Sequence, residues 1–181
     1  MRVDARILGA GLLALTLFVP ACSRKAATAA GTHSPLYTGK EAKRAVRLTL
    51  PGRDQAGFVY VDRSLFATTS VVNQGKQLLQ DLMQGPSPAE TQAVPCFGPD
   101  ASFLELYLDG QGLAVVDLPR ATVDGLPGGT SAEVATLYCL IRTLEQNLPA
   151  VSRVQVLIDG QVPESLRGHL DLQEPLTLND L

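Results

Sequence analysis

The stretch TSAEVATLYCLIRTLEQNLPAVSRVQVLIDG, residues 130–160, decides the fold. In its first half, apolar residues recur at spacings of three and four, which is the pattern of an amphipathic helix. They are Val134, Leu137, Ile141, Leu144 and Leu148. Thr130 and Glu133 have the spacing of a capping box, so each side chain is expected to satisfy a free amide of the first turn. Pro149 ends the helix, because the residue before a proline is disfavoured in the α region.

The second half of the stretch alternates between apolar and polar residues. Val154, Val156 and Ile158 share one side, which is typical of a half-buried strand. Asp159 and Gly160 form a turn signal that closes this strand. A helix with such an apolar stripe needs a sheet to cover it, so the rest of the chain should supply further strands.

Upstream residues predict two hairpins with a helix between them. Strands are expected at 46–50, 58–61, 103–108 and 113–118, with a helix over 71–84 and a loop over 119–129. Residues 65–67 are a candidate extension of the second strand. Ser70 is the expected N-cap of that helix and Gly85 its C-terminal cap. Gly75 lowers the helix propensity, which indicates close packing against a neighbour. Residues 166–172 predict one short edge strand. The order predicts an α+β fold, a two-layer sandwich with two helices on one face of a small mixed sheet.

The N-terminal residues predict export and lipidation. Residues 7–19 form an apolar run too short to span a membrane, which is typical of a signal peptide. Val19, Ala21 and Cys22 resemble the lipobox of bacterial lipoproteins, which implies a signal over 1–21 and a diacylated Cys22 thiol. The alternative is a plain secretory peptide with Cys22 as a spare thiol. Residues 22–45 lack a persistent period and predict a disordered tether, which leaves a domain over 46–176 and a tail over 177–181.

Charge is divided between the tether and the domain. Residues 24–47 contain six basic residues and one acid, whereas residues 48–181 contain seven basic and sixteen acidic residues. An acidic folded part argues against nucleic acid as a partner, because nucleic acid requires a basic face. Tryptophan is absent and aromatic residues make up 5% of the chain, so a stacking platform for bases or sugars is not expected.

Cys96 and Cys139 remain as a pair if Cys22 is lipidated. In an oxidising compartment the two could form a disulfide. The alternative is that Cys139 is a small buried residue of the helix and Cys96 a loop residue. Their spacing matches no metal motif, and His33 and His169 add no ligand pattern, so neither a metal nor a cofactor is expected.

Several short sequence segments, at or near the ends of these predicted elements, resemble the GerMN domain family of sporulation and germination lipoproteins. They are LLQDLMQGPSP, LAVVDLP, LIRTLEQNLPAVSRV, VQVLIDG and GHLDLQEPL, together with AVP in the intervening loop. The resemblance covers about 46–176 and implies a fold similar to the ring-building modules of secretion systems, which act through their surfaces. It carries over no catalytic residue.

Three candidate reactive features have simpler structural interpretations. Asp117 and Glu133 could form a carboxylate pair, but a strand end for Asp117 and a capping box for Glu133 are the preferred explanation. The GLPGG loop, residues 125–129, could cradle an anion but lacks the lysine of a P-loop. His169 lies near Asp171 without a nucleophile pattern beside it. No catalytic residues are therefore predicted.

The expected function is a non-enzymatic, membrane-anchored interaction module. A sheet edge or helix face should bind another envelope protein or a second copy, in a transenvelope complex or a spore-related process. The alternative is a binding module for cell-wall glycan or a small polar ligand. Ser23 after the lipidated cysteine resembles the outer-membrane sorting pattern of diderm bacteria. In a diderm the protein should therefore be anchored in the outer membrane and face the periplasm. In a monoderm it should be anchored in the outer leaflet of the cell membrane.

Overall fold

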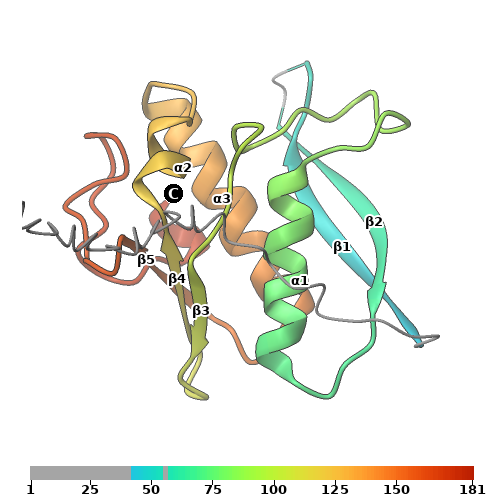
Figure 1. Cartoon of the computed structure of the whole chain (residues 1–181). Coiled ribbons are helices and arrows are strands. Elements are labelled where there is room, and N and C mark those ends of the chain that lie inside the picture. Colours follow the sequence, from blue (N-terminus) through green and yellow to red (C-terminus); the bar gives the residue numbers. More distant parts are fainter. Residues whose placement is uncertain (1–41, 55–56) are drawn as a thin grey trace, which may run out of the picture. The chain divides into compact units, whose positions relative to one another are not determined.

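The computed structural model describes residues 42–54 and 57–181, and its first feature is a long hairpin (Figure 1). β1 (Lys43–Pro51) pairs antiparallel with β2 (Phe58–Phe66). β1 is longer than the predicted 46–50, and β2 continues beyond Val61 into the predicted extension, as far as Phe66. The apolar side of the hairpin is buried and belongs to the core, with Leu48 facing Val61.

α1 (Val71–Gln84) begins and ends as predicted. The Ser70 hydroxyl accepts a hydrogen bond from the Asn73 amide at 3.2 Å, and Gly85 ends the helix with a φ of 73°. A Cβ at Gly75 would overlap Leu106 Cδ2 and lie 3.3 Å from Leu148 Cδ1. The prediction of close packing at Gly75 is therefore confirmed, and this glycine lets α1 approach the neighbouring sheet.

The second sheet has three strands with β4 in the centre. β3 (Glu105–Leu108) pairs antiparallel with β4 (Leu113–Leu118), which pairs in parallel with β5 (Arg153–Ile158). The parallel pair requires a crossover, and α3 supplies it. One face of this sheet is buried, through Leu106 on β3 and the alternate apolar residues of β4 and β5.

α3 (Thr130–Asn147) matches the predicted helix, but its N-terminus does not. Gly129 is the N-cap, no side chain caps the helix, and Glu133 bonds elsewhere, so the predicted capping box is wrong. The loop predicted over 119–129 contains a short helix, α2 (Arg120–Asp124), which follows Pro119.

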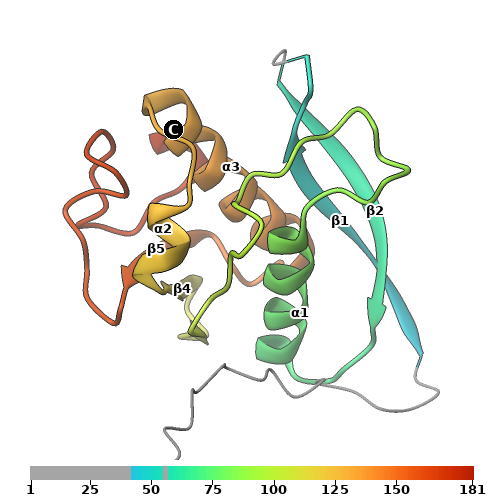
Figure 2. The ribbon, with the colours of Figure 1, turned by 45° about the horizontal axis from the view of Figure 1, so that its top comes forward.

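The α+β class and the order of the elements are confirmed, but the strands form two sheets and not one. α1 contacts β1 and β3, while α3 contacts β1 and β5. The two helices lie between the hairpin and the three-stranded sheet in both views (Figures 1 and 2). The hairpin does not join the other sheet because side chains of α3 occupy the free edge of β1, as described below.

The C-terminal segment covers the outer edge of β5. Val154 and Leu176 exchange two backbone hydrogen bonds of 2.8 Å, and Leu172 and Leu176 are buried. The predicted strand over 166–172 is absent; an isolated bridge joins Ser165 to Asp171 instead. A single 3-10 turn, η1 (Leu178–Asp180), follows.

Candidate functional site

The inner edge of the hairpin is closed by polar side chains of α3. The Arg47 amide donates to Asn147 Oδ1 at 2.9 Å, and the Asn147 side-chain amide donates back to the Arg47 carbonyl at 2.6 Å. The Thr49 amide donates to Thr143 Oγ1 at 3.0 Å. Backbone groups that would otherwise recruit another strand are therefore satisfied by a helix, which is one way to block an edge.

The same register leaves the outer edge of β2 available. Arg47 faces Asp62 and Thr49 faces Tyr60 across the hairpin. Because Arg47 and Thr49 direct their amides away from β2, their partners are non-hydrogen-bonded positions that direct amides and carbonyls to the opposite side. Within residues 42–54 and 57–181, no strand pairs with that side of β2. Between Phe58 and Leu65, β2 thus presents an edge that can accept another strand.

The edges of the other sheet are less available. The C-terminal segment bonds to β5, as described above. At β3, the Leu106 amide donates to the carboxylate of Glu105 at 2.8 Å, and that carboxylate also pairs with Lys76 of α1. β3 has only four residues. The outer edge of β2 is therefore the longest strand edge that the described part of the chain offers.

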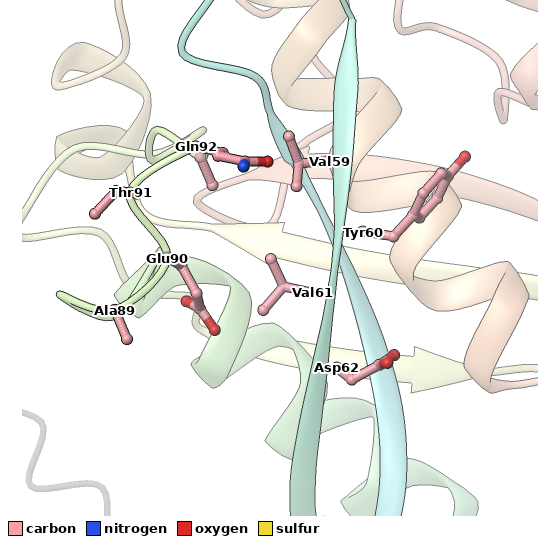
Figure 3. Close-up of a pocket in the computed structure, with 9 residues that line it drawn as sticks. Val59, Tyr60, Val61, Asp62, Ala89, Glu90, Thr91 and Gln92 are labelled. Carbon is pink, nitrogen blue, oxygen red and sulfur yellow. The ribbon is translucent and has the colours of Figure 1, made fainter.

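A groove of about 320 Å³ runs beside β2. Its walls are Val59–Asp62 on the strand and Ala89–Ala93 in the loop after α1. Figure 3 shows Val59 and Val61 directed toward the loop, where Glu90 and Gln92 lie, whereas Tyr60 and Asp62 point to the other side of the strand. The groove therefore combines an apolar floor from β2 with a polar rim from the loop.

Arg63 fixes the loop wall of this groove. Its guanidinium forms a bidentate pair with Glu90, with one bond of 2.7 Å, and donates to the Gly85 carbonyl at 3.2 Å. Arg63 Nε also lies 3.3 Å from Asp81 Oδ2 on α1, although not in hydrogen-bond geometry. One largely buried cation thus joins β2, α1 and the loop.

The two carboxylates around Arg63 respond differently to this environment. Burial opposes ionisation of Glu90, but the Ser87 amide and Arg63 together outweigh it and hold the pKa of Glu90 below its usual value. At Asp81, burial dominates over the attraction of Arg63 and raises the pKa. The Arg63–Glu90 pair therefore stays charged at neutral pH, and Asp81 is the member that takes up a proton most readily as the pH falls.

The opposite side of β2 packs on α3 through aromatic rings. Phe58 stacks on Tyr138, with ring centroids 4.0 Å apart and planes inclined by 20°. Burial is the largest cause that raises the pKa of Tyr138, and the neighbouring Tyr60 hydroxyl raises it further. Tyr60 is 49% exposed, so it adds an amphipathic ring to the outer surface beside the free edge.

The two carboxylates proposed as a pair from the sequence, Asp117 and Glu133, have different partners in the structure. Asp117 Oδ1 accepts a hydrogen bond from the Gly160 amide at 2.9 Å and stabilises the turn after β5. Glu133 is buried and lies 2.6 Å from His169 Nδ1. Burial opposes its ionisation, but His169 and the backbone amides of the C-terminal segment outweigh burial and hold the pKa of Glu133 below its usual value. The Glu133–His169 pair therefore connects α3 to the C-terminal segment.

The remaining candidates have structural roles or lie elsewhere. Gly125 caps α2, and Gly129 begins α3 with a φ of 104°, so the glycine loop serves two helix ends. Asp171 accepts from the Gln173 amide. Cys96 and Cys139 are free and buried, and burial, followed by the adjacent Cys96 thiol, raises the pKa of Cys139. Cys22 lies outside the described residues.

The described residues contain neither a cluster of metal ligands nor a membrane-spanning helix. Across 42–54 and 57–181, no three histidine, cysteine, aspartate or glutamate side chains gather as metal ligands would. Over the same ranges, no helix is long and apolar enough to cross a bilayer.

Sequence reasoning missed both the free edge and the groove. The sequence predicts the strand over 58–61 and its extension past Arg63, but it does not predict which side of that strand lacks a partner, because strand pairing is not a local property. The groove has no local signal, because Arg63 and Glu90 are brought together only by the packing of α1.

Comparisons with known proteins agree with this fold. A structure of a provisionally assigned lipoprotein from Clostridium perfringens matches at 22% identity and a TM-score of 0.54, over 80% of this chain and 95% of that one. The first GerMN domain of the sporulation protein GerM from Bacillus subtilis matches at 18% identity and a TM-score of 0.57, over 75% and 98%. The tandem GerMN domains of the same protein match at 15% identity and a TM-score of 0.57, and the chain spans half of that structure. No curated protein matches the chain.

The family comparison covers most of the chain. Residues 37–164 match the Germane model, which is described by sporulation and spore germination and not by a reaction. This range includes both hairpins, the three helices and β5. The chain therefore belongs to the Germane family of GerMN-type domains.

Proposed function

We propose that the chain is an envelope lipoprotein, held at a membrane by Cys22, whose GerMN domain binds another envelope protein without catalysing a reaction. The observation that carries the proposal is the outer edge of β2, which has outward backbone groups at Tyr60 and Asp62 and no strand partner among the described residues. Addition of an extended segment to such an edge is a general mode of protein recognition.

The groove gives this edge a means of selecting its partner. Side chains of a strand alternate between its two faces. A segment added to β2 would therefore place every second side chain over the groove, between Val61 and the Glu90–Gln92 loop. The intervening side chains would lie beside Tyr60. The fitting partner is thus an extended segment with small or medium apolar residues at alternate positions.

The proposed anchor restricts where that partner can lie. Twenty residues separate Cys22 from β1. Fully extended, such a segment spans at most about 70 Å. The partner segment should therefore lie within about this distance of the membrane surface, allowing for the dimensions of the domain. The Clostridium perfringens structure and the sporulation-related family support an extracytoplasmic setting for the proposal.

The test is site-specific photo-crosslinking in intact cells. A photo-reactive residue replaces Ser64, which is exposed on β2, or Gln111, which is exposed in the turn between β3 and β4. The proposal predicts a protein adduct from position 64 and little or none from position 111. Equal yields from both positions would contradict it. Recovery of wall fragments alone from position 64 would replace it with the glycan-binding alternative.

A further inference from the structure

We infer that Cys96 and Cys139 form a disulfide in the exported protein, joining the loop after α1 to the middle of α3. Both residues are buried, at 3% and 0% exposure, and each carries a free thiol in this structure. The Cys96 side chain lies close enough to Cys139 to raise the pKa of the Cys139 thiol. The inference rests on the extracytoplasmic location in the proposed function, since disulfides persist in oxidising compartments.

A buried hydrogen bond holds the loop in register with α3. The Thr136 hydroxyl donates to the Cys96 carbonyl at 3.0 Å. Residues three apart lie on the same face of a helix, so Thr136 places Cys96 beside Cys139. A hydrogen bond to the backbone of Cys96 therefore places the loop against the turn of α3 that carries Cys139.

The chain that follows Cys96 is also anchored. The Ser102 amide donates to Thr122 Oγ1 at 2.9 Å, and the Thr122 hydroxyl donates back to the Ser102 carbonyl at 2.9 Å. A Cβ at Gly98 would lie 2.9 Å from the Gly125 carbonyl oxygen, which shows how closely the loop crosses the end of α2. Thr136 and Thr122 therefore hold this segment at Cys96 and at Ser102, on either side of Gly98.

A metal site does not explain the two thiols. Two cysteines are insufficient for a structural zinc site, which takes four ligands. No further histidine or acidic ligand joins them among residues 42–54 and 57–181. The chemistry that fits two adjacent thiols without a third ligand is oxidation to a disulfide.

The oxidation balances as a thiol–disulfide exchange. One cysteine thiolate attacks the disulfide of a thiol oxidoreductase or of an oxidised small thiol and releases one thiolate from it. The second cysteine then attacks the mixed disulfide, which forms the Cys96–Cys139 bond and releases the other thiolate. Two electrons pass to the oxidant, and the two protons of the cysteines end on its thiols. Because both cysteines are buried once folded, the exchange precedes the final packing of the loop.

The bond would brace the wall of the groove beside β2. Cys96 lies three residues after Ala93 in the same loop. Arg63 holds the start of this loop through Glu90, and the disulfide would hold its end on α3. Oxidation should therefore stabilise the unliganded groove without closing its opening.

The direct test is mass spectrometry of the full, exported protein, alkylated under denaturing conditions without reduction. The inference predicts a linked peptide pair containing Cys96 and Cys139, with alkylation at Cys22 or at no cysteine. Alkylation of both Cys96 and Cys139 would overturn it. This outcome would leave the proposed function standing, because the Ser64 adduct does not depend on the disulfide.

A second measurement distinguishes a stabilising bond from an incidental one. Reduction should lower the midpoint of urea unfolding of the native protein, by removing a constraint on the unfolded chain. The matched control is the double variant Cys96→Ser, Cys139→Ala, whose midpoint should not respond to the reductant. An unchanged midpoint of the native protein on reduction would contradict a bracing role even if the bond forms.

Discussion

Replacement of Gly75 by alanine tests the packing of α1 on the three-stranded sheet. At an unobstructed helical position this change stabilises a helix by about 1 kcal/mol. Here the new methyl group would overlap Leu106 Cδ2, and Leu106 is 1% exposed and has little room to move. Overpacking of a filled core costs about 1–3 kcal/mol. The expected net effect of Gly75→Ala is therefore a loss of about 0–2 kcal/mol in the free energy of unfolding, in place of the gain at an unobstructed position.

Urea unfolding followed by circular dichroism measures this loss, and a double-mutant cycle assigns it to Leu106. Leu106→Ala alone should cost about 2–5 kcal/mol through the cavity that it leaves. In the double variant the alanine at position 75 enters that cavity, so the two losses should fall short of additivity by about 1–2 kcal/mol. Gly128→Ala is the control, since no atom lies within 4 Å of its Cβ position. A stabilising Gly75→Ala, or additive losses, would refute the packing.

Three further predictions concern polar contacts. Arg63→Met leaves two partly buried carboxylates, Asp81 and Glu90, without their cation and should lower the free energy of unfolding in urea by about 2–3 kcal/mol. The loss is smaller than for a fully buried pair because the Arg63 side chain is 18% exposed. A loss below about 0.5 kcal/mol would contradict the role of Arg63 in holding β2, α1 and the loop together. Asn147→Ala exposes the β1 edge at Arg47 and should lower the free energy of unfolding, measured in the same way, by about 1 kcal/mol. Hydrogen exchange at the Arg47 amide should become faster, and unchanged exchange would contradict the proposed protection of this edge by Asn147. Glu133 has a folded-state pKa below its unfolded value of about 4.5, so its stabilisation is present above that pH and is lost as the pH falls through the folded pKa. Urea midpoints between pH 7 and pH 3 should therefore fall more steeply for the native protein than for Glu133→Gln, and parallel curves would contradict this.

The fold was predictable where the signal is local. The apolar period of residues 130–148, the Ser70 cap and the stop at Gly85 each lie within one element, and each gave the right element. The division into two sheets was not predictable, because it depends on Thr143 and Asn147 reaching the β1 backbone about 100 residues away. These polar residues, one turn apart on α3, were the available signal.

The prediction of a capping box at Thr130 and Glu133 was wrong for a similar reason, because a residue distant in the sequence binds the carboxylate. Glu133 has the correct spacing from Thr130, but a residue 36 positions downstream, His169, competes for its carboxylate. The expectation of a sheet edge as the interaction site came from the family resemblance and from general recognition modes. Its assignment to β2 required the register of the hairpin.

The most direct test of the account compares two substitutions of Asp62 in cells that carry the photo-reactive residue at position 64. Asp62→Pro removes an outward amide, which an edge position tolerates, and Asp62→Asn keeps that amide. Both remove the exposed ion pair with Arg47, which is worth little. With unchanged circular dichroism for both variants, the account predicts that the adduct is lost in Asp62→Pro and retained in Asp62→Asn. Equal adduct yields from the two variants would contradict strand addition at β2.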